Sequence, residues 1–314
     1  MIVKPPEKTE QLRQLEIIMK RRSSIPSDLS ELYGRELAGY LGEQSLPYYL
    51  HLASFTSHYD LYNLRLEFNN YHFQMDGLFL FPTFFLLIEV KHLKGTISIN
   101  QAGQLIQTKE SEEKIYQHPL HQANLQKEQL QHLLYSLGHD TIPIHTLTTL
   151  THREANLTFH DPDVIPIQQL PFRIKELSKT YAEAQLIADK RLQLSKQLIS
   201  LHRNRPLSFS KLTKDNVKNI KRGVYCPRCE AIMKRIYGTW KCYSCGCQDK
   251  QAHLSALIDY SYLFGYSITN KQARWFLLLD SIYTTSRLLK QLDIESKGRT
   301  KFRIYNLKNL LLRK

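Results

Sequence analysis

Long hydrophobic runs are missing from this chain of 314 residues. A membrane-spanning helix needs about 20 predominantly apolar residues. The most apolar stretch, residues 78–88, is much shorter and contains Pro82. The N-terminal segment MIVKPPEKTE is too polar for a secretory signal peptide. We therefore expect a cytoplasmic protein with no membrane partner.

Cysteine is also scarce, and it is absent from most of the sequence. The chain has 5 cysteines, all of them between residues 226 and 247. A disulfide framework would distribute cysteines along the chain, and a cytosolic compartment would keep them reduced. The clustering therefore argues against a disulfide-stabilised fold and indicates a metal site.

Acidic residues are few in the last third of the sequence. Residues 1–195 contain 19 Lys and Arg against 22 Asp and Glu, whereas residues 196–314 contain 24 against 7. Such an excess of positive charge, with no hydrophobic anchor, favours nucleic acid as the partner. The alternative is a solvated basic surface that binds nothing specific. The content of 42% hydrophobic and 23% charged residues argues against a disordered chain.

Residues 28–152 alternate between helical and strand patterns. A helix is predicted to begin at Ser27 or Asp28, and segments 61–68, 71–81 and 84–91 are predicted strands. A hairpin over 96–108, a helix opened by His118 and Pro119, and a strand over 142–151 follow. This order predicts an α/β domain with a mixed sheet flanked by helices.

Three charged residues lie on the predicted strands 71–81 and 84–91. If the strands form a hairpin about Pro82, Asp76 and Glu89 lie opposite each other, and Lys91 shares a face with Glu89. Two carboxylates make a hard-oxygen site for Mg²⁺ or Mn²⁺, and a neighbouring lysine can orient a water or balance charge. The alternative is a solvated strand end and a polar residue near a turn.

The motifs around this trio resemble those of the NERD (nuclease-related) domain of the PD-(D/E)XK nuclease-like superfamily. The resemblance covers roughly residues 37–152. It rests on Gly39-Tyr-Leu-Gly42-Glu43, Gln74-Met-Asp76, Ile88-Glu89-Val90-Lys91, Gly95, His118-Pro119 and Gln122. Where the family commonly has Asn before the proline, this chain has His118.

The resemblance implies a restriction-endonuclease-like fold and a set of site residues. Asp76 and Glu89 would bind the divalent metal, and Lys91 would be the catalytic lysine. Glu43 would hold a metal-bound water or a second ion, and Gln74 and Gln122 would support the site. Because Gln122 belongs to a glutamine-rich helix, it is equally well explained as a surface residue.

Paired Cys-x-x-Cys motifs occur in the basic part of the chain. Cys226 and Cys229 are separated by twelve residues from Cys242 and Cys245, which is the arrangement of a four-cysteine structural zinc site. Gly238 fits the turn of a hairpin between the two pairs. The segment resembles a zinc ribbon whose folding depends on the metal. Cys247 is a spare thiol because the spacing favours Cys245.

Basic and aromatic residues accompany these cysteines. Phosphates and bases would be bound by Arg228, Lys234, Arg235, Lys241, Tyr237 and Trp240. Alternatively, the two aromatic rings fill a small core, which is the better explanation for Trp240.

The C-terminal segment has the element order of a small winged-helix module. Helices are predicted over 254–263, 271–279 and 284–292, and a turn at Gly298 precedes a strand over 301–307. The helix over 284–292 would read a groove of the nucleic acid. A hairpin would contact phosphate through Lys297, Arg299, Lys301 and Arg303. A helical cap packed on the ribbon would explain the same apolar residues.

These observations predict a metal-dependent nuclease that acts on nucleic acid, with DNA as the expected substrate. The alternative is an inactive nucleic-acid-binding or regulatory protein on a nuclease scaffold. The predicted domains are an N-terminal extension (1–27), a NERD-like domain (28–152), a helical connector and basic linker (153–224), a zinc ribbon (225–248) and a C-terminal module (249–314).

Overall fold

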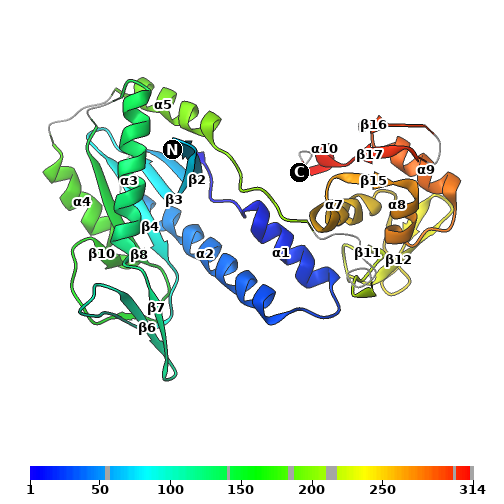
Figure 1. Ribbon diagram of the computed structural model, residues 1–314, viewed down its shortest axis with the longest axis horizontal. Helices are drawn as coiled ribbons and strands as arrows, with labels where there is room; N and C mark the ends of the chain where they lie inside the picture. The colour runs from blue at the N-terminus through cyan, green and yellow to red at the C-terminus, as the bar shows by residue number, and fades with distance from the viewer. Residues whose placement is uncertain (54–56, 140–141, 183–186, 210–217, 300–301, 312–314) are drawn as a thin grey trace. The chain divides into compact units, whose positions relative to one another are not determined.

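The computed structural model describes residues 1–53, 57–139, 142–182, 187–209, 218–299 and 302–311. The chain divides into two compact units (Figure 1). Unit 1 contains Met1–Thr9 and Gly34–Arg205, and unit 2 contains Glu10–Tyr33 and Pro206–Lys314. The division falls inside helix α2, Ser27–Leu52.

Unit 1 is built on a sheet of 6 strands in the order β1-β2-β3-β4-β8-β10. Strands β2, β3 and β4 are antiparallel, whereas β1, β8 and β10 each run parallel to their neighbour. The strands are β1 (Ile2–Lys4), β2 (Tyr59–Phe68), β3 (Tyr71–Leu80), β4 (Phe85–Lys91), β8 (Ile144–Leu150) and β10 (Val164–Pro166). The predicted mixed sheet is thus confirmed.

Helices cover both faces of this sheet. The helices of unit 1 besides α2 are α3 (Pro119–Ser136), α4 (Leu170–Thr180) and α5 (Ala188–Leu201), and η1 (Ile167–Gln169) is a short 3-10 turn. One face packs against α2 and α4 through residues such as Leu46, Ile88 and Ile174. The other packs against α3 and α5 through residues such as Leu87, Leu130 and Leu194. Burial on both faces explains why β4 is an almost unbroken apolar run.

A smaller sheet follows β4 along the chain. Its order is β7-β6-β5-β9, and β9 runs parallel to β5. The strands are β5 (Gly95–Ile99), β6 (Leu105–Lys109), β7 (Glu112–Tyr116) and β9 (Ala155–Leu157). The predicted hairpin is the pair β5 and β6, with Gly103 at positive φ in the turn between them.

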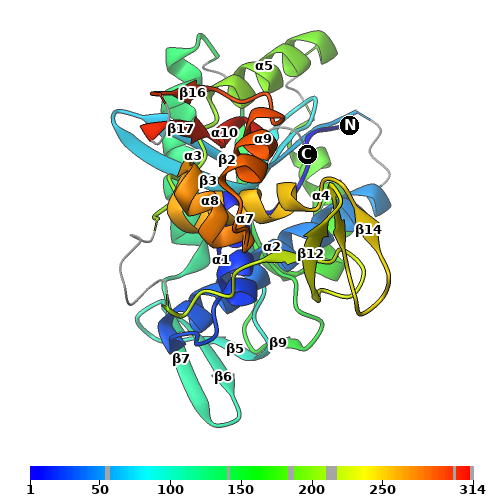
Figure 2. The same ribbon diagram turned by 90° about the vertical axis from the view of Figure 1, so that its right-hand side faces the viewer.

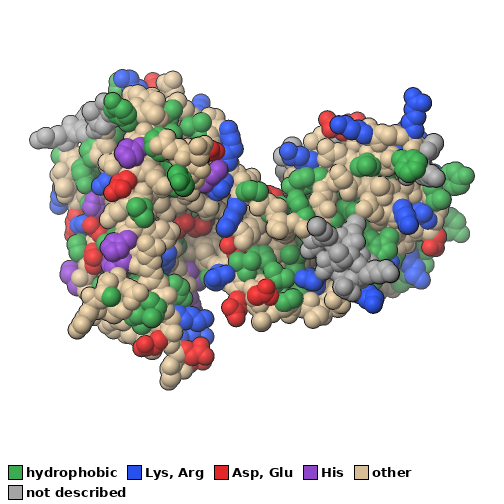
Figure 3. All heavy atoms as spheres, viewed as in Figure 1, with side chains coloured by type: hydrophobic (Ala, Val, Ile, Leu, Met, Phe, Trp, Pro, Cys, Tyr) green, Lys and Arg blue, Asp and Glu red, His purple; other side chains and the backbone are tan. Residues whose placement is uncertain are grey.

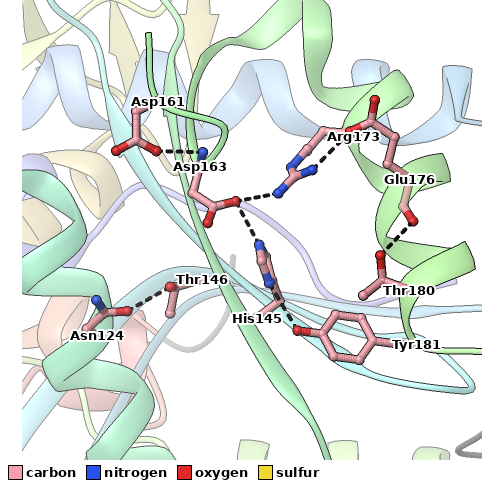
Figure 4. A network of polar contacts seen from close by, with 9 residues as sticks. All are labelled: Asn124, His145, Thr146, Asp161, Asp163, Arg173, Glu176, Thr180 and Tyr181. Carbon is pink, nitrogen blue, oxygen red and sulfur yellow. Dashed lines mark hydrogen bonds and ion pairs between the residues drawn. The ribbon is translucent and has the colours of Figure 1, made fainter.

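Polar contacts join α4 to the large sheet at the end where β8 begins (Figure 4). His145 on β8 bonds Asp163 at 2.8 Å and the Tyr181 hydroxyl at 3.2 Å. Arg173 of α4 donates to the same Asp163 oxygen at 2.9 Å. Burial raises the pKa of Asp163, but the bonds from His145 and Arg173 outweigh burial and hold that pKa below its usual value. The network fixes α4 on the sheet.

Unit 2 begins with α1 (Glu10–Arg21), which contacts helix α7. Its β-strands form a sheet over the cysteine region and a three-stranded sheet of order β15-β17-β16 (Figure 2). The strands are β11 (Val224–Tyr225), β12 (Ile232–Ile236), β13 (Thr239–Lys241), β14 (Gln248–Asp249), β15 (Ser267–Thr269), β16 (Ser296–Lys297) and β17 (Ile304–Asn306). The C-terminal helices are α7 (His253–Phe264), α8 (Asn270–Leu277), α9 (Ile282–Lys290) and α10 (Lys308–Leu311).

One hydrophobic core joins the cysteine region to the C-terminal helices. Met233 and Trp240 from the hairpin β12–β13 belong to the same buried cluster as Leu257, Phe276 and Leu288. The helices therefore cover the hairpin, as a helical cap would. The elements α7, β15, α8, α9, β16 and β17 follow one another in this order along the chain.

Candidate active site and metal centre

Asp76 and Glu89 lie at one end of the large sheet, where β3 and β4 separate. The pairing of these strands ends at Gly77 with Ile88, so Asp76 and Glu89 fall opposite each other and on one face. Beyond that pair, the backbone N–H of Val90 donates to Asp76 Oδ2 at 2.9 Å. Glu89 is 2% exposed, whereas Asp76 is partly exposed.

Lys91 and two glutamines of α3 complete this face. Lys91 Nζ lies 2.7 Å from Glu89 Oε1 and donates to Gln122 Oε1 at 3.1 Å. Gln126 Nε2 donates to the other oxygen, Glu89 Oε2, at 3.3 Å. Gln126 is not among the site residues predicted from the sequence. The sequence does place Gln126 four residues after Gln122 on one helix, and residues with this spacing share a helix face.

Glu43 reaches the site because α2 packs very closely on β4 and on Thr151, the residue that follows β8. A Cβ atom at Gly42 would lie 2.7 Å from Val90 Cγ1 and 2.9 Å from Thr151 Oγ1. Only glycine allows this approach without displacement of a neighbour. Glu43, the next residue, is buried, and its Oε2 atom has no hydrogen-bond partner among the described residues.

The electrostatics of the three carboxylates suit a cation. Burial raises the pKa of Glu43 to about 8, with a lowering by Lys4 and smaller raising effects of Glu36 and Glu89. Burial, Glu89 and Glu43 together raise the pKa of Asp76 well above its usual value. Acids that are close together and desolvated resist ionisation unless positive charge is supplied. Hard oxygen ligands of this kind are those that Mg²⁺ and Mn²⁺ prefer.

Comparison with known families bears on the same part of the chain. The family model of the nuclease-related domain, NERD, matches residues 38–151. Residues 38–151 form a NERD domain. No curated protein and no solved structure matched the chain. The matched range contains Glu43, Asp76, Glu89 and Lys91, so the geometric cluster lies within the NERD domain.

Gln74 of the NERD domain hydrogen-bonds to the neighbouring strand β2. Its Nε2 atom donates to Asn63 Oδ1 at 2.6 Å. Asn63 lies on β2 at φ 51° and interrupts the pairing of β2 with β3 beside Asp76. Lys4 of β1, which the sequence does not mark as a site residue, donates to the Tyr62 and Asn63 carbonyls at 2.7 and 3.0 Å. Gln74 and Lys4 thus stabilise the irregular strand next to the site.

His118 occupies the N-cap position of α3. Its Nδ1 atom accepts a hydrogen bond from the Leu120 backbone N–H at 3.3 Å. An asparagine at this position would cap the helix with its side-chain oxygen in the same way. The departure of this NERD domain from the family pattern therefore preserves a helix cap that helps to place Gln122.

The second candidate centre is the four-cysteine cluster of unit 2. The Sγ atoms of Cys226, Cys229, Cys242 and Cys245 all lie within 4.8 Å of one another. Four thiolates at about 2.3 Å from one Zn²⁺ would have similar spacings. The cluster is therefore consistent with a structural zinc ribbon. The fifth cysteine, Cys247, is not part of it, as the spacing predicted.

Two matching turns present the thiols. Glu230 N donates to the Cys226 carbonyl at 2.9 Å, and Gly246 N donates to the Cys242 carbonyl at 3.0 Å. Both donor residues have positive φ, 58° for Glu230 and 72° for Gly246. The hairpin between the turns reverses at Gly238, which confirms the predicted turn.

The predicted nucleic-acid-binding residues of unit 2 are placed as follows. Lys234 and Lys241 are cross-strand neighbours on the hairpin, an arrangement that is unfavourable without an anion. Arg235 lies 5.4 Å from the ring of Trp240. Lys297, Arg299 and Arg303 flank the turn at Gly298, Arg228 lies between the first two cysteines, and Lys301 lies outside the described residues.

Trp240 and Tyr237 have opposite environments. Trp240 is 1% exposed, and its Nε1 donates to His253 Nδ1 at 3.3 Å. The core explanation is therefore right for Trp240. Tyr237 is fully exposed at the tip of the hairpin.

Lys and Arg side chains are spread over the visible face of unit 2 (Figure 3). In the described part of the chain, no helix is long and apolar enough to cross a membrane.

Proposed function

We propose that this protein is a metal-dependent nuclease that hydrolyses phosphodiester bonds of nucleic acid, with DNA as the expected substrate. The observation that carries the proposal is the convergence of Glu43, Asp76 and Glu89 beside Lys91 within a NERD domain. Three buried or half-buried carboxylates that repel one another would only destabilise a protein in which they had no binding role.

Asp76 and Glu89 are the residues that would hold a divalent cation, with Glu43 beside them. The unpartnered Glu43 Oε2 and the raised pKa values of Glu43 and Asp76 support this assignment, because a cation would relieve both. Bound Mg²⁺ or Mn²⁺ supplies positive charge for the phosphate and makes a water more acidic.

The position of Lys91 allows its ammonium to act on the substrate. Its ammonium is fixed by Glu89 on one side and Gln122 on the other, yet its side chain remains 22% exposed. It can therefore donate to a phosphate oxygen or orient a water that approaches from solvent. Gln126 occupies the second Glu89 oxygen and so keeps that carboxylate in one orientation.

Unit 2 is proposed to hold the nucleic acid. Its element order and its sheet of order β15-β17-β16 support a winged-helix module, in which α9 would enter a groove. The zinc ribbon and this module share one core, so they would present one basic surface.

The test is cleavage of labelled DNA and RNA by the purified full-length chain with Mg²⁺ or Mn²⁺. We expect Asp76→Asn and Lys91→Met to lower the rate by at least about a hundredfold. Glu128→Gln, which removes an exposed carboxylate from the same helix as Gln126, should keep the wild-type rate. Equal rates for all four proteins would refute the assigned roles.

The competing function is nucleic-acid binding without cleavage. Calorimetry with Mn²⁺ distinguishes the nuclease from the inactive scaffold. The nuclease requires a second metal site, with hard oxygen ligands, in addition to the zinc site, and Asp76→Asn should abolish Mn²⁺ binding there. Salt-sensitive DNA binding with neither Mn²⁺ binding nor turnover would favour the inactive scaffold.

A further inference from the structure

Unit 2 contains a cavity between the zinc-binding hairpin and the end of α9. Its volume is about 610 Å³. Arg235 and Tyr237 come from the hairpin, Lys250 and His253 from the segment around the start of α7, and Arg287 and Gln291 from α9 and its C-cap. None of the described residues that line it is Asp or Glu.

Arg235 carries a charge that is only partly compensated. Its Nη2 donates to the Gly238 carbonyl at 3.0 Å, whereas its Nε and Nη1 atoms are buried and have no hydrogen-bond partner among the described residues. Burial, and then the charge of Arg287, lowers the pKa of Arg235. Two guanidinium groups therefore face one region without a carboxylate between them, which is unfavourable unless an anion binds there.

Lys250 and Arg287 are the other Lys and Arg side chains that line the cavity. In the part of the chain that the structure describes, no ion pair joins Lys250 or Arg287 to an acid. The nearby carboxylate of Asp249 accepts a bond from the Gln251 backbone N–H at 2.7 Å. The C-terminal end of α9 contributes about half a negative elementary charge. Three full positive charges outweigh that contribution.

From this arrangement we infer that the cavity binds a backbone phosphate of a nucleic-acid strand. Guanidinium groups match phosphate oxygens in geometry as well as in charge. Tyr237 points to nucleic acid rather than to a free phosphate, because its fully exposed ring lies at the rim, where a base can stack on it. The inference rests on the proposed nucleic-acid substrate, but it requires no cleavage.

The test uses the full-length chain with Asp76→Asn in every protein, so that the probe is not cut. Binding of a fluorescein-labelled single-stranded DNA is followed by anisotropy at several salt concentrations without chelator. Arg287→Gln and Lys250→Gln change exposed side chains and leave the core intact. Lys290→Gln is the matched control, because it removes an exposed cation from α9 outside the cavity.

We expect Arg287→Gln and Lys250→Gln each to weaken binding by roughly five- to tenfold and to reduce the salt slope by about 0.7. Arg287→Lys should restore most of the affinity, and Tyr237→Ala should lower it roughly tenfold. Lys290→Gln should change the affinity less than twofold.

Equal losses for Lys290→Gln and Arg287→Gln would overturn the inference, because they would indicate a diffuse basic surface. It would also be overturned if millimolar inorganic phosphate stabilised the protein through Arg287 while DNA affinity stayed independent of Arg287. Cleavage is measured separately with Asp76 intact. Inactive protein that still binds through Arg287 would refute the proposed nuclease and leave the phosphate site standing.

Discussion

Arg21 is the residue whose replacement should most clearly destabilise unit 2. Its side chain is 1% exposed and lies 2.7 Å from Asp259 Oδ2. Its Nη1 atom also donates to the Gly223 carbonyl at 2.8 Å, and its guanidinium lies 4.0 Å from the ring of Tyr225. One side chain of α1 thus joins α7 to the segment that precedes the zinc ribbon.

The magnitude follows from what Arg21→Ala leaves behind. Asp259, whose side chain is 14% exposed, would lose its partner, and breaking a buried pair from one side costs about 3–5 kcal/mol. Lys20→Ala is the control, since Lys20 and Glu230 are exposed and 3.8 Å apart, and such pairs contribute less than about 1 kcal/mol. The double variant Arg21→Met, Asp259→Leu should recover part of the loss, because it leaves no buried charge.

The assay is urea unfolding followed by tryptophan fluorescence. The chain has only Trp240 and Trp275, and both belong to unit 2, so the signal reports that unit alone. Arg21→Ala should lower the urea midpoint by more than about 1 M, given a slope of about 1–3 kcal/mol per molar. A shift no larger than that of Lys20→Ala would refute the reasoning.

Two further predictions concern the same unit. Metal analysis should find one zinc per chain, and Cys245→Ser should abolish zinc binding. Loss of the metal should also shift the Trp240 emission to the red, because the hairpin packs on the core through Trp240. Unchanged emission in metal-free protein would contradict this. Burial and the charge of Arg235 lower the pKa of His253 to about 4. As the pH falls, His253 is therefore protonated in the unfolded chain before it is protonated in the folded chain. The free energy of unfolding should decrease between about pH 6.5 and about pH 4, by at most about 3 kcal/mol. His253→Asn, which keeps an acceptor for Trp240, should remove that part of the slope in pH-dependent unfolding, and an unaltered slope would count against it.

The sequence predicted much of the fold because local patterns decide it. The strands that became β2, β3 and β4 alternate or are continuously apolar, and the turns between them contain Asn69, Asn70 and Pro82. The position of Asp76 opposite Glu89 follows from counting residues on either side of the hairpin turn. The spacing of the four cysteines, likewise, needs no tertiary information to indicate a metal.

Long-range packing decided the rest. Residues 1–27 read as a polar extension, yet β1 adds to the sheet and α1 carries Arg21 into the core of unit 2. Gln126 and Lys4 become neighbours of the carboxylate cluster only when α3 and β1 pack beside it.

What the sequence by itself determined is therefore the identity of the reactive groups: three acids and a lysine in one half, and four thiols and an excess of cations in the other. Tertiary structure alone decided which of them lose water and which lack a partner. The raised pKa of Glu43 and the unpaired N–H groups of Arg235 arise from burial among residues distant in sequence. Desolvation depends on everything that surrounds a group, and no local pattern records it.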